Sequence, residues 1–363
     1  MSQSPLRVGF VGATPDSGWA RYAHIPAIQA LPEVSLSAVA TTRRESAERA
    51  ASAFGAAHAF TSVADLAACA DVDLVAVSVK APQHFGAVMT AIDGGKHVFV
   101  EWPMGANAEQ SRAMTEAASK AGVRGFVGLQ DRASPTVRHA RKLVADGYLG
   151  RVYGATMWSA YPHWATRCFA AYAADVASGA DVLAIPGGHG LDVIRCVLND
   201  EVTRLAGWET RLRPTVLALD VQREVPKTAA DQFAASGQLG SGALFSVHVV
   251  GAAVHGERWR LQLVGDEGEL VLEGDGMPEM TPLRLFGTRN RDAFPTPIEV
   301  AEGPPAGLPE PAGNMAGLWA MIAADLRDGT ATAPDFECGL RLRATLAAIA
   351  GSAAAENAPR AVG

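Results

Sequence analysis

The sequence places side chains that can carry a proton at Lys80, Tyr161, His163 and His189. His189 follows two glycines and precedes the run Leu191–Ile194, whose pattern predicts the start of an amphipathic helix. An imidazole titrates close to neutral pH, so His189 is a candidate to take or give the proton of a hydroxyl group. The alternative is a histidine that only caps or packs at the helix start.

Lys80 directly follows the apolar run Leu74–Val79, which predicts a strand. Parallel sheets open onto their ligands at the carboxyl ends of the strands. Lys80 is therefore a candidate catalytic cation, with two alternatives: contact with a nucleotide, or an ion pair with Glu101.

The segment 159–167 gathers Tyr161, His163 and Trp164 after another predicted strand. Aromatic faces stack on ring-shaped substrates, and Tyr161 or His163 is a candidate acid. A surface lid without chemistry is the alternative.

The apolar run Leu6–Val11 is followed by a glycine and a loop, which indicates a nucleotide site. Such a site needs glycine where the backbone turns tightly against a pyrophosphate at a helix N-terminus. Gly9 and Gly12 fit, and Ala13 and Trp19 stand in a loop that is longer than in the GxGxxG motif. An ordinary strand-to-helix turn is the alternative, because the motif alone is not specific.

A second predicted strand, Leu36–Ala40, is followed by Thr41, Thr42, Arg43 and Arg44 without an acidic residue. An Asp or Glu there binds the ribose hydroxyls of NAD, whereas hydroxyl and guanidinium groups suit the 2′-phosphate of NADP. We therefore expect NADP in preference to NAD, held by Thr41, Thr42 and Arg43. The alternative is a solvated helix turn.

Glu101 ends a further predicted strand, beside Trp102 and Pro103. A carboxylate at this edge suits the ribose or amide of a nicotinamide nucleotide. The Trp102 ring is expected to cover the nicotinamide or the substrate, or else to fill the core. Gln130 leaves the last strand of the same predicted sheet and is expected to line the cleft.

Short apolar runs alternate with predicted helices over 44–54, 84–93 and 108–121, which is typical of βαβ units. Beyond a helix over 135–147, longer alternating runs and the turn 240–242 predict antiparallel hairpins, followed by helices near 315–328 and 335–356. We predict a doubly wound α/β Rossmann domain over 1–130. An α+β domain with a large, mostly antiparallel open sheet follows over 131–363, and its last helix can pack back on the first domain.

Composition excludes several classes of protein. The 363 residues are 48% hydrophobic and carry a net charge of −7, so a core can form and general nucleic-acid binding is disfavoured. We expect no membrane span and no signal peptide. The 4 cysteines form no CxxC and the histidines do not cluster, so we expect no metal site and a cytoplasmic location.

Several segments together resemble the Gfo/Idh/MocA family of nicotinamide-dependent oxidoreductases, and most of all its Gal80-like branch. They are Gly9–Gly12 with Gly18–Ala20, Val77–His84, Val100–Pro103, Gly188–Asp192, Val225–Thr228 and Leu270–Asp275. The resemblance covers nearly the whole chain. It implies a Rossmann domain, a second domain with a large sheet, nicotinamide between them, and oligomers formed through the open sheet face.

The resemblance also implies a Glu-Lys-Pro lysine, an aspartate and a histidine as catalytic groups. Here the lysine position is Trp102 and the aspartate position is Ile185, so that only His189 of the trio is present. Tryptophan carries no cation and donates no proton at neutral pH. The same Trp replacement occurs in Gal80, a nucleotide-binding transcriptional regulator.

Three functions follow from these observations. The first is an NAD(P)-dependent oxidoreductase that acts on a carbonyl/hydroxyl pair, or an imine, of a small polar metabolite such as a sugar or cyclitol. The second is a catalytically inactive nucleotide-binding regulator or sensor with a protein partner. The third is a lyase or glycosidase that uses transient oxidation. We expect a homodimer or homotetramer formed through the second domain's sheet, and no direct contact with nucleic acid or membrane.

Overall fold

The computed structural model describes residues 4–362 apart from 17, 254, 255 and 304. Its contacts divide the chain into two units: the first ends at Ser134 and also takes the segment between Gly303 and Arg341, and the rest forms the second. The sequence placed a single boundary at 130. The returning segment contains α8 (Ala312–Asp328), and it groups with the first unit because Trp319 and Ile322 are buried in that unit's core.

The first unit is built on a six-stranded parallel sheet in the order β3-β2-β1-β4-β5-β6. This order is the doubly wound arrangement that the sequence predicted. The strands are β1 (Leu6–Val11), β2 (Val34–Ala40), β3 (His58–Phe60), β4 (Leu74–Val77), β5 (His97–Glu101) and β6 (Gly125–Gly128).

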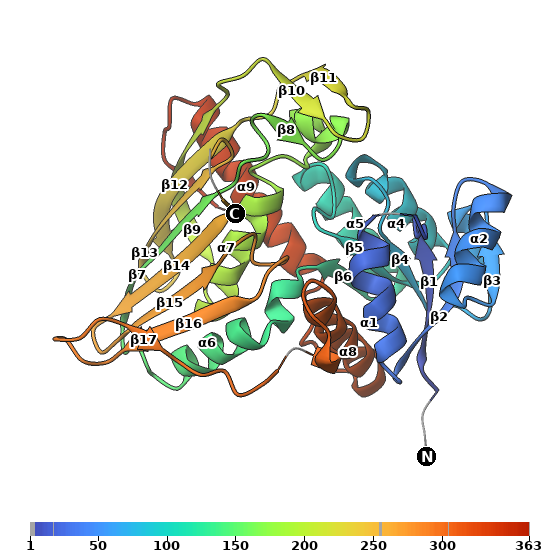
Figure 1. The fold of residues 1–363 in the computed structure, drawn as a ribbon, viewed down its shortest axis with the longest axis horizontal. Helices are drawn as coiled ribbons and strands as arrows, with labels where there is room; N and C mark the ends of the chain where they lie inside the picture. Colours follow the sequence, from blue (N-terminus) through green and yellow to red (C-terminus); the bar gives the residue numbers. More distant parts are fainter. Residues whose placement is uncertain (1–3, 17, 254–255, 304, 363) are drawn as a thin grey trace. The chain divides into compact units, whose positions relative to one another are not determined.

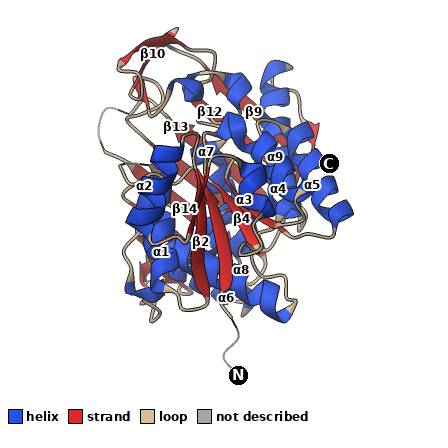
Figure 2. Cartoon of the chain, turned by 90° about the vertical axis from the view of Figure 1, so that its right-hand side faces the viewer, coloured by secondary structure: helices blue, strands red, loops and turns tan. Residues whose placement is uncertain are grey.

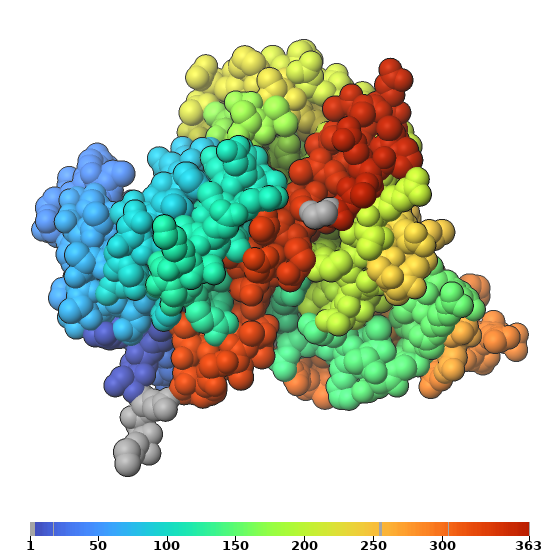
Figure 3. Space-filling view, turned by 180° about the vertical axis from the view of Figure 1, so that it is seen from behind, coloured from blue at the N-terminus to red at the C-terminus, as the bar shows by residue number. Residues whose placement is uncertain are grey.

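Helices cover both faces of this sheet. Figure 2 shows α1 and α2 on one side of the central strands and α3, α4 and α5 on the other. They are α1 (Ile25–Ala30, after a π-helical turn Ala20–His24), α2 (Arg44–Phe54), α3 (Val63–Ala68), α4 (His84–Asp93) and α5 (Ala108–Ala121). On the face shown in Figure 3, the orange-red end of α8 lies beside the loop after α5, where Arg124 Nη1 donates to the carbonyl oxygen of Asp325 (3.1 Å).

The second unit is built on a nine-stranded sheet in the order β17-β16-β15-β14-β7-β13-β12-β9-β18. Every pair is antiparallel except β7 with β13. The strands are β7 (Val152–Ala160), β9 (Val202–Thr210), β12 (Gln232–Leu239), β13 (Leu244–Val250), β14 (Arg258–Gly265), β15 (Glu269–Gly274), β16 (Leu283–Thr288), β17 (Thr296–Pro297) and β18 (Arg360–Ala361).

Helices α6 (Pro135–Ala145) and α7 (Ile185–Leu198) lie on one side of the large sheet, as Figure 1 shows. The outward-facing side exposes Trp158, Trp208 and Leu244. Helix α9 (Phe336–Ala354) and a three-stranded sheet complete the chain, the latter made of β8 (Arg167–Cys168), β10 (Thr215–Ala218) and β11 (Arg223–Pro226).

The start of α7 corrects the sequence analysis. The helix begins at Ile185, so His189 lies inside it rather than at its start. A Cβ on Gly187 would lie 2.6 Å from the Phe233 ring, and one on Gly190 would lie 2.4 Å from Met157 Sδ. Glycine is unusual inside a helix, so these residues hide the helix start in the sequence. Their lack of a side chain is what allows the helix to approach the sheet closely.

Among the described residues, no helix has the length and apolar character required to cross a membrane.

Candidate functional site

A pocket of about 680 Å³ opens at the carboxyl ends of the first unit's central strands. None of the described residues that line it carries a charge. Hydroxyl and amide groups alternate with small apolar side chains: the lining is Val11, Gly12, Ala13, Thr14, Ala40, Thr41, Thr42, Ser46, Thr61, Ser62, Val63, Ala64, Val79, Gln83, Gly86, Ala87 and Thr90. The size and the lining suit a nucleoside, and the position is where doubly wound sheets bind nucleotides.

The two predicted glycines have different roles. Gly12 has a φ of +96°, and a Cβ there would lie 2.8 Å from the carbonyl oxygen of Ser78. Gly12 therefore forms the tight turn at the pocket, as predicted. Gly9 lies inside β1, where a Cβ would lie 2.7 Å from Leu66 Cδ2. It permits close packing of α3 on the strand and does not line the pocket.

The turn after β2 is held by its own hydroxyl groups. Thr41 Oγ1 donates to the carbonyl oxygen of Arg43 (3.1 Å) and lies 2.6 Å from Ser46 Oγ. The Arg44 guanidinium donates to the carbonyl oxygen of Ala59 (2.8 Å). The exposed guanidinium of Arg43 has no partner within the described part of the chain. Arg43 is thus the available cation beside Thr41 and Thr42.

Glu101 and Trp19, both predicted to bind cofactor, contact each other. Trp19 Nε1 donates to Glu101 Oε1 (3.1 Å), which also pairs with Nε2 of the fully buried His24. Trp319 Nε1 donates to His24 Nδ1 (3.1 Å). Because an indole only donates, Nδ1 must be an acceptor, and the neutral His24 ring carries its proton on Nε2, toward Glu101.

A histidine at the start of α4 holds the segment after β5 in place. Trp102 and Pro103 are buried, and the His84 ring lies between the carbonyl oxygens of Pro103 (2.9 Å) and Val79 (3.0 Å). Burial lowers the pKa of His84, and its contacts with two backbone carbonyls mark the ring as structural. Lys80, at the end of the same Val79 segment, is exposed.

Gln130 is 1% exposed, and its Oε1 has no hydrogen-bond partner among the described residues. A buried carbonyl oxygen without a partner is costly, so this atom is available to a ligand or a water molecule. None of these contacts tests the cofactor roles of Glu101, Trp102, Pro103, Gln130 and Lys80, which stay predictions.

In the second unit, His189 lies next to a carboxylate that the sequence did not indicate. A ring nitrogen of His189 and a carboxylate oxygen of Glu279 lie within 4.8 Å of each other. The two residues are 5% and 3% exposed. Glu279 lies on the loop after β15, which has no motif, and only the fold reveals its burial.

Two further polar atoms are buried where the central strands of the large sheet end, and we call this end of the sheet an edge. Ser159 in β7 pairs in register with Trp259 in β14, which in turn pairs with Gly274 at the end of β15. Ser159 Oγ and Trp259 Nε1 have no hydrogen-bond partner among the described residues. We call His189, Glu279, Ser159 and Trp259 the polar edge. Its buried groups can donate to and accept from a small hydroxylated ligand.

Tyr161 and His163 follow β7 at that edge. Tyr161 is 1% exposed. Arg167 Nε donates to His163 Nδ1 (2.8 Å), so Nδ1 is an acceptor and the Nε2 proton of the neutral ring faces Glu257 (3.3 Å). Both nitrogens of His163 are therefore engaged, whereas Tyr161 presents a buried hydroxyl. The catalytic roles of both residues stay predictions.

The lysine of the Val225–Thr228 motif contacts the backbone of the segment 159–167. Lys227 is buried, forms an ion pair with the buried Asp231, and donates to the carbonyl oxygen of Trp164. Trp164 has a φ of +74°. Lys227 therefore holds the backbone at Trp164 in place.

The comparisons with known proteins agree with this architecture. Residues 6–129 match a family model described as an oxidoreductase family with an NAD-binding Rossmann fold, and residues 135–274 match the C-terminal domain of Gal80p.

Relatives include both a regulator and an enzyme. The galactose/lactose metabolism regulatory protein GAL80 of Saccharomyces cerevisiae is 27% identical over 80% of this chain and 72% of its own length. The dehydrogenase aclE of Aspergillus oryzae is 31% identical over 65% of this chain and 67% of its own length.

Among solved structures, levoglucosan dehydrogenase in complex with NADH superposes with a TM-score of 0.84 at 21% identity, covering 99% of each chain. At that identity the likeness shows the shared fold. Together with the family models and the relatives, it shows that this chain belongs to the Gfo/Idh/MocA family of NAD-binding oxidoreductases.

Proposed function

We propose that this chain is an NAD(P)-dependent oxidoreductase that moves a hydride between nicotinamide and a carbonyl/hydroxyl pair, or an imine, of a small polar metabolite. The observation that carries the proposal is the buried imidazole beside a buried carboxylate, His189 and Glu279. Burying two ionisable groups costs stability, and a protein that only binds nucleotide has no need of them.

The residues of the first unit fit the cofactor. Gly12 lets the backbone turn tightly at a pocket of about 680 Å³ that suits a nucleoside. The absence of a carboxylate from the described lining and the available guanidinium of Arg43 support NADP as the preferred cofactor. When bound, nicotinamide supplies the hydride acceptor or donor.

The second unit supplies the proton chemistry. His189 takes the hydroxyl proton when the substrate is oxidised and returns it when the carbonyl is reduced. Glu279 stabilises the imidazolium that forms and is a positioning residue. Ser159, Trp259 and Tyr161 are suited to hold the substrate's hydroxyl groups.

A regulator without turnover is the second candidate, and Trp102 favours it. Its indole is 5% exposed at the position where the family has a lysine, so it supplies neither a cation nor a proton. The similarity to the regulatory protein GAL80 also supports this candidate.

The exposed side chains on the open face of the nine-stranded sheet favour a second subunit as a partner. Trp158, Trp208 and Leu244 are each more than 40% exposed there. Exposed aromatic and aliphatic side chains on one sheet face are typical of an interface between subunits. We propose that a second copy of this chain covers the face, which predicts a dimer or tetramer in sedimentation experiments and a smaller species for Trp158→Glu.

The proposed activity is tested by binding and turnover measured on one preparation. Nucleotide binding is followed by fluorescence, and nicotinamide absorbance is followed against sugars, cyclitols, ketones and imines. Turnover with any of them supports the enzyme. Confirmed binding without turnover across the panel favours the regulator, and absence of binding contradicts both functions.

A further inference from the structure

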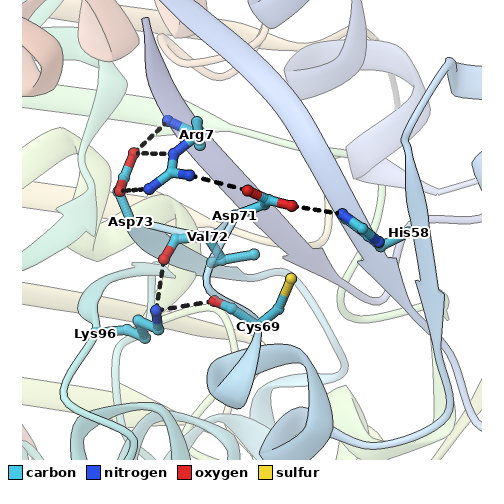
Figure 4. A network of polar contacts seen from close by, with 7 residues as sticks. All are labelled: Arg7, His58, Cys69, Asp71, Val72, Asp73 and Lys96. Carbon is cyan, nitrogen blue, oxygen red and sulfur yellow. Dashed lines mark hydrogen bonds and ion pairs between the residues drawn. The ribbon is translucent and has the colours of Figure 1, made fainter. Parts of the chain in front are cut away.

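A second cluster of chemically active side chains lies in the first unit, away from the strand ends that form the pocket. Figure 4 shows the Cys69 side chain directed toward the side on which His58 and Asp71 meet. One ligand atom from each of these three residues lies within 4.8 Å of the others. His58 begins β3, Cys69 follows α3, and Asp71 precedes β4. We propose that these three side chains bind a Zn²⁺ ion.

The geometry fits a tetrahedral ion with little movement. His58 Nε2 and Asp71 Oδ2 are 3.0 Å apart. Metal–ligand bonds of about 2.0–2.3 Å place the ligand atoms of a zinc site roughly 3.3–3.6 Å apart. The ion therefore fits between these two atoms after a small widening, and the Cys69 side chain rotates to complete the set. Partial exposure leaves room for a water molecule as the fourth ligand.

The ligand types select the metal. A set of one nitrogen, one sulfur and one carboxylate oxygen suits a borderline cation such as Zn²⁺, whereas Mg²⁺ and Ca²⁺ require oxygen ligands. Binding requires the thiolate form of Cys69 and releases its proton, so the affinity rises with pH.

The positive charges of Arg7 and Lys96 do not repel the Zn²⁺ ion strongly, because Asp73 neutralises Arg7 and backbone carbonyls bind Lys96. The Arg7 guanidinium pairs with Asp73 through Nη2–Oδ1 (2.6 Å) and Nε–Oδ2 (3.0 Å), and this contact lowers the pKa of Asp73. Arg7 Nη1 also donates to Asp71 Oδ1 (3.2 Å), which leaves Oδ2 for the metal. Such outer contacts orient ligands in metal sites.

Lys96 fixes the loop that carries two of the three ligands. Its ammonium donates to the carbonyl oxygens of Cys69 (3.0 Å) and Val72 (2.6 Å). The backbone of this loop is therefore held in place before any ion binds, which lowers the entropy cost of closing the site.

The site joins the two ends of one β–α segment. His58 begins β3 and Cys69 follows α3, and between them Thr61, Ser62, Val63 and Ala64 line the nucleotide pocket. β3 is a short edge strand with one neighbour in the sheet. Zinc thus clamps the segment that forms one wall of the pocket, and we expect bound Zn²⁺ to raise the melting temperature.

The test uses Co²⁺ as a spectroscopic substitute on the reduced, chelator-treated full chain. We expect one equivalent of Co²⁺ to produce a thiolate-to-cobalt charge-transfer band that Zn²⁺ abolishes by displacement. Cys69→Ser should remove the band. His58→Gln should weaken binding at least as much as the roughly 10–100-fold lost when an outer-shell partner is removed. His139→Gln, at a half-buried histidine of α6 outside the cluster, is the matched control and should bind like the wild type.

A second readout does not depend on the variants folding. Cys69 is half-buried, whereas Cys168, Cys196 and Cys338 are buried, so Cys69 should be the fast-reacting thiol toward a disulfide reagent. Zn²⁺ should slow that reaction in the wild type. A charge-transfer band that survives Cys69→Ser, or a fast thiol that Zn²⁺ does not protect, would overturn the proposal.

Discussion

The nucleotide pocket and the polar edge are built in opposite ways. The pocket is formed by strand ends, the positive-φ Gly12 and small neutral side chains, and none of its described lining residues is ionisable. The polar edge is formed by side chains from β7, α7, β14 and the loop after β15, and its centre is a buried imidazole beside a carboxylate.

This difference teaches that binding and chemistry are separable in this fold. Replacement of the family's lysine by Trp102 and of its aspartate by Ile185 leaves the pocket complete. Under the proposed function, it changes only the groups that would move the proton. A chain can therefore keep its nucleotide while its catalytic equipment is lost or, as proposed here, rebuilt with Glu279.

The largest expected effect comes from the polar edge. His189→Asn should lower kcat by about 10²–10⁴-fold, because proton transfer by a positioned side chain contributes that much. Nucleotide affinity should stay unchanged. A variant with near-normal turnover would show that His189 is not the proton carrier and that the comparison of the two regions is wrong.

The next effect belongs to the pocket. Arg43→Ala should weaken NADPH binding by roughly 10–100-fold through loss of a charged contact to the 2′-phosphate, and leave NADH binding unchanged. Arg44→Ala is the matched control, because Arg44 is already bonded to Ala59 and should affect neither cofactor. Equal losses for NADPH and NADH titrated by fluorescence would argue against the phosphate contact.

Glu279→Gln should have a smaller effect on turnover, about 10-fold, since His189 remains to carry the proton. The pH profile of kcat/KM separates positioning from general damage. Without the carboxylate the imidazolium is less stable, so the limb that reports its ionisation should move to lower pH. An unmoved profile with lower activity would indicate a structural role only.

The smallest expected effect concerns the pH dependence of stability, which depends on a half-buried ionisable group of the second unit. Burial, followed by the charge of Asp181, raises the pKa of Glu209 in β9 from 4.5 to about 7. The unfolded carboxyl ionises first as pH rises, so this group's favourable contribution is complete below about pH 4.5 and is lost as pH rises through about 7.

Glu209→Gln should therefore be more stable than the wild type at about pH 8, by roughly 1–2 kcal/mol. Partial exposure screens part of the ~1.4 kcal/mol per pKa unit. Urea unfolding at several pH values measures this difference. Glu224→Gln, at an exposed carboxylate, is the control and should leave the pH dependence of the wild type in place.

The fold class of the first unit could be predicted from the sequence because its signals are local, although β3, α1, α3 and the return of α8 were not predicted. The helices 44–54, 84–93 and 108–121 have the bounds that their apolar spacing predicts. The strand-end residues Gly12, Ala13, Thr41 and Thr42, which were predicted to bind cofactor, line the pocket. Their contact with a cofactor stays a prediction.

The polar edge and the cluster of His58, Cys69 and Asp71 escaped prediction because tertiary packing creates them. Glu279 is one acidic residue on a loop, and only the fold buries it beside His189. The glycines of α7 conceal a helix in the sequence, although they are the positions where it approaches Phe233 and Met157. His58, Cys69 and Asp71 have no motif spacing and converge only when β3 joins the sheet.

The most direct test of the proposed function follows the hydride itself. The wild type is loaded with NADPH deuterated at the transferring carbon of nicotinamide, mixed with a small-molecule metabolite extract and analysed by mass spectrometry, with His189→Asn beside it. We expect deuterium in a small polar metabolite with the wild type and little with the variant. Deuterium that stays on the bound nucleotide in both would contradict an oxidoreductase and favour the regulator.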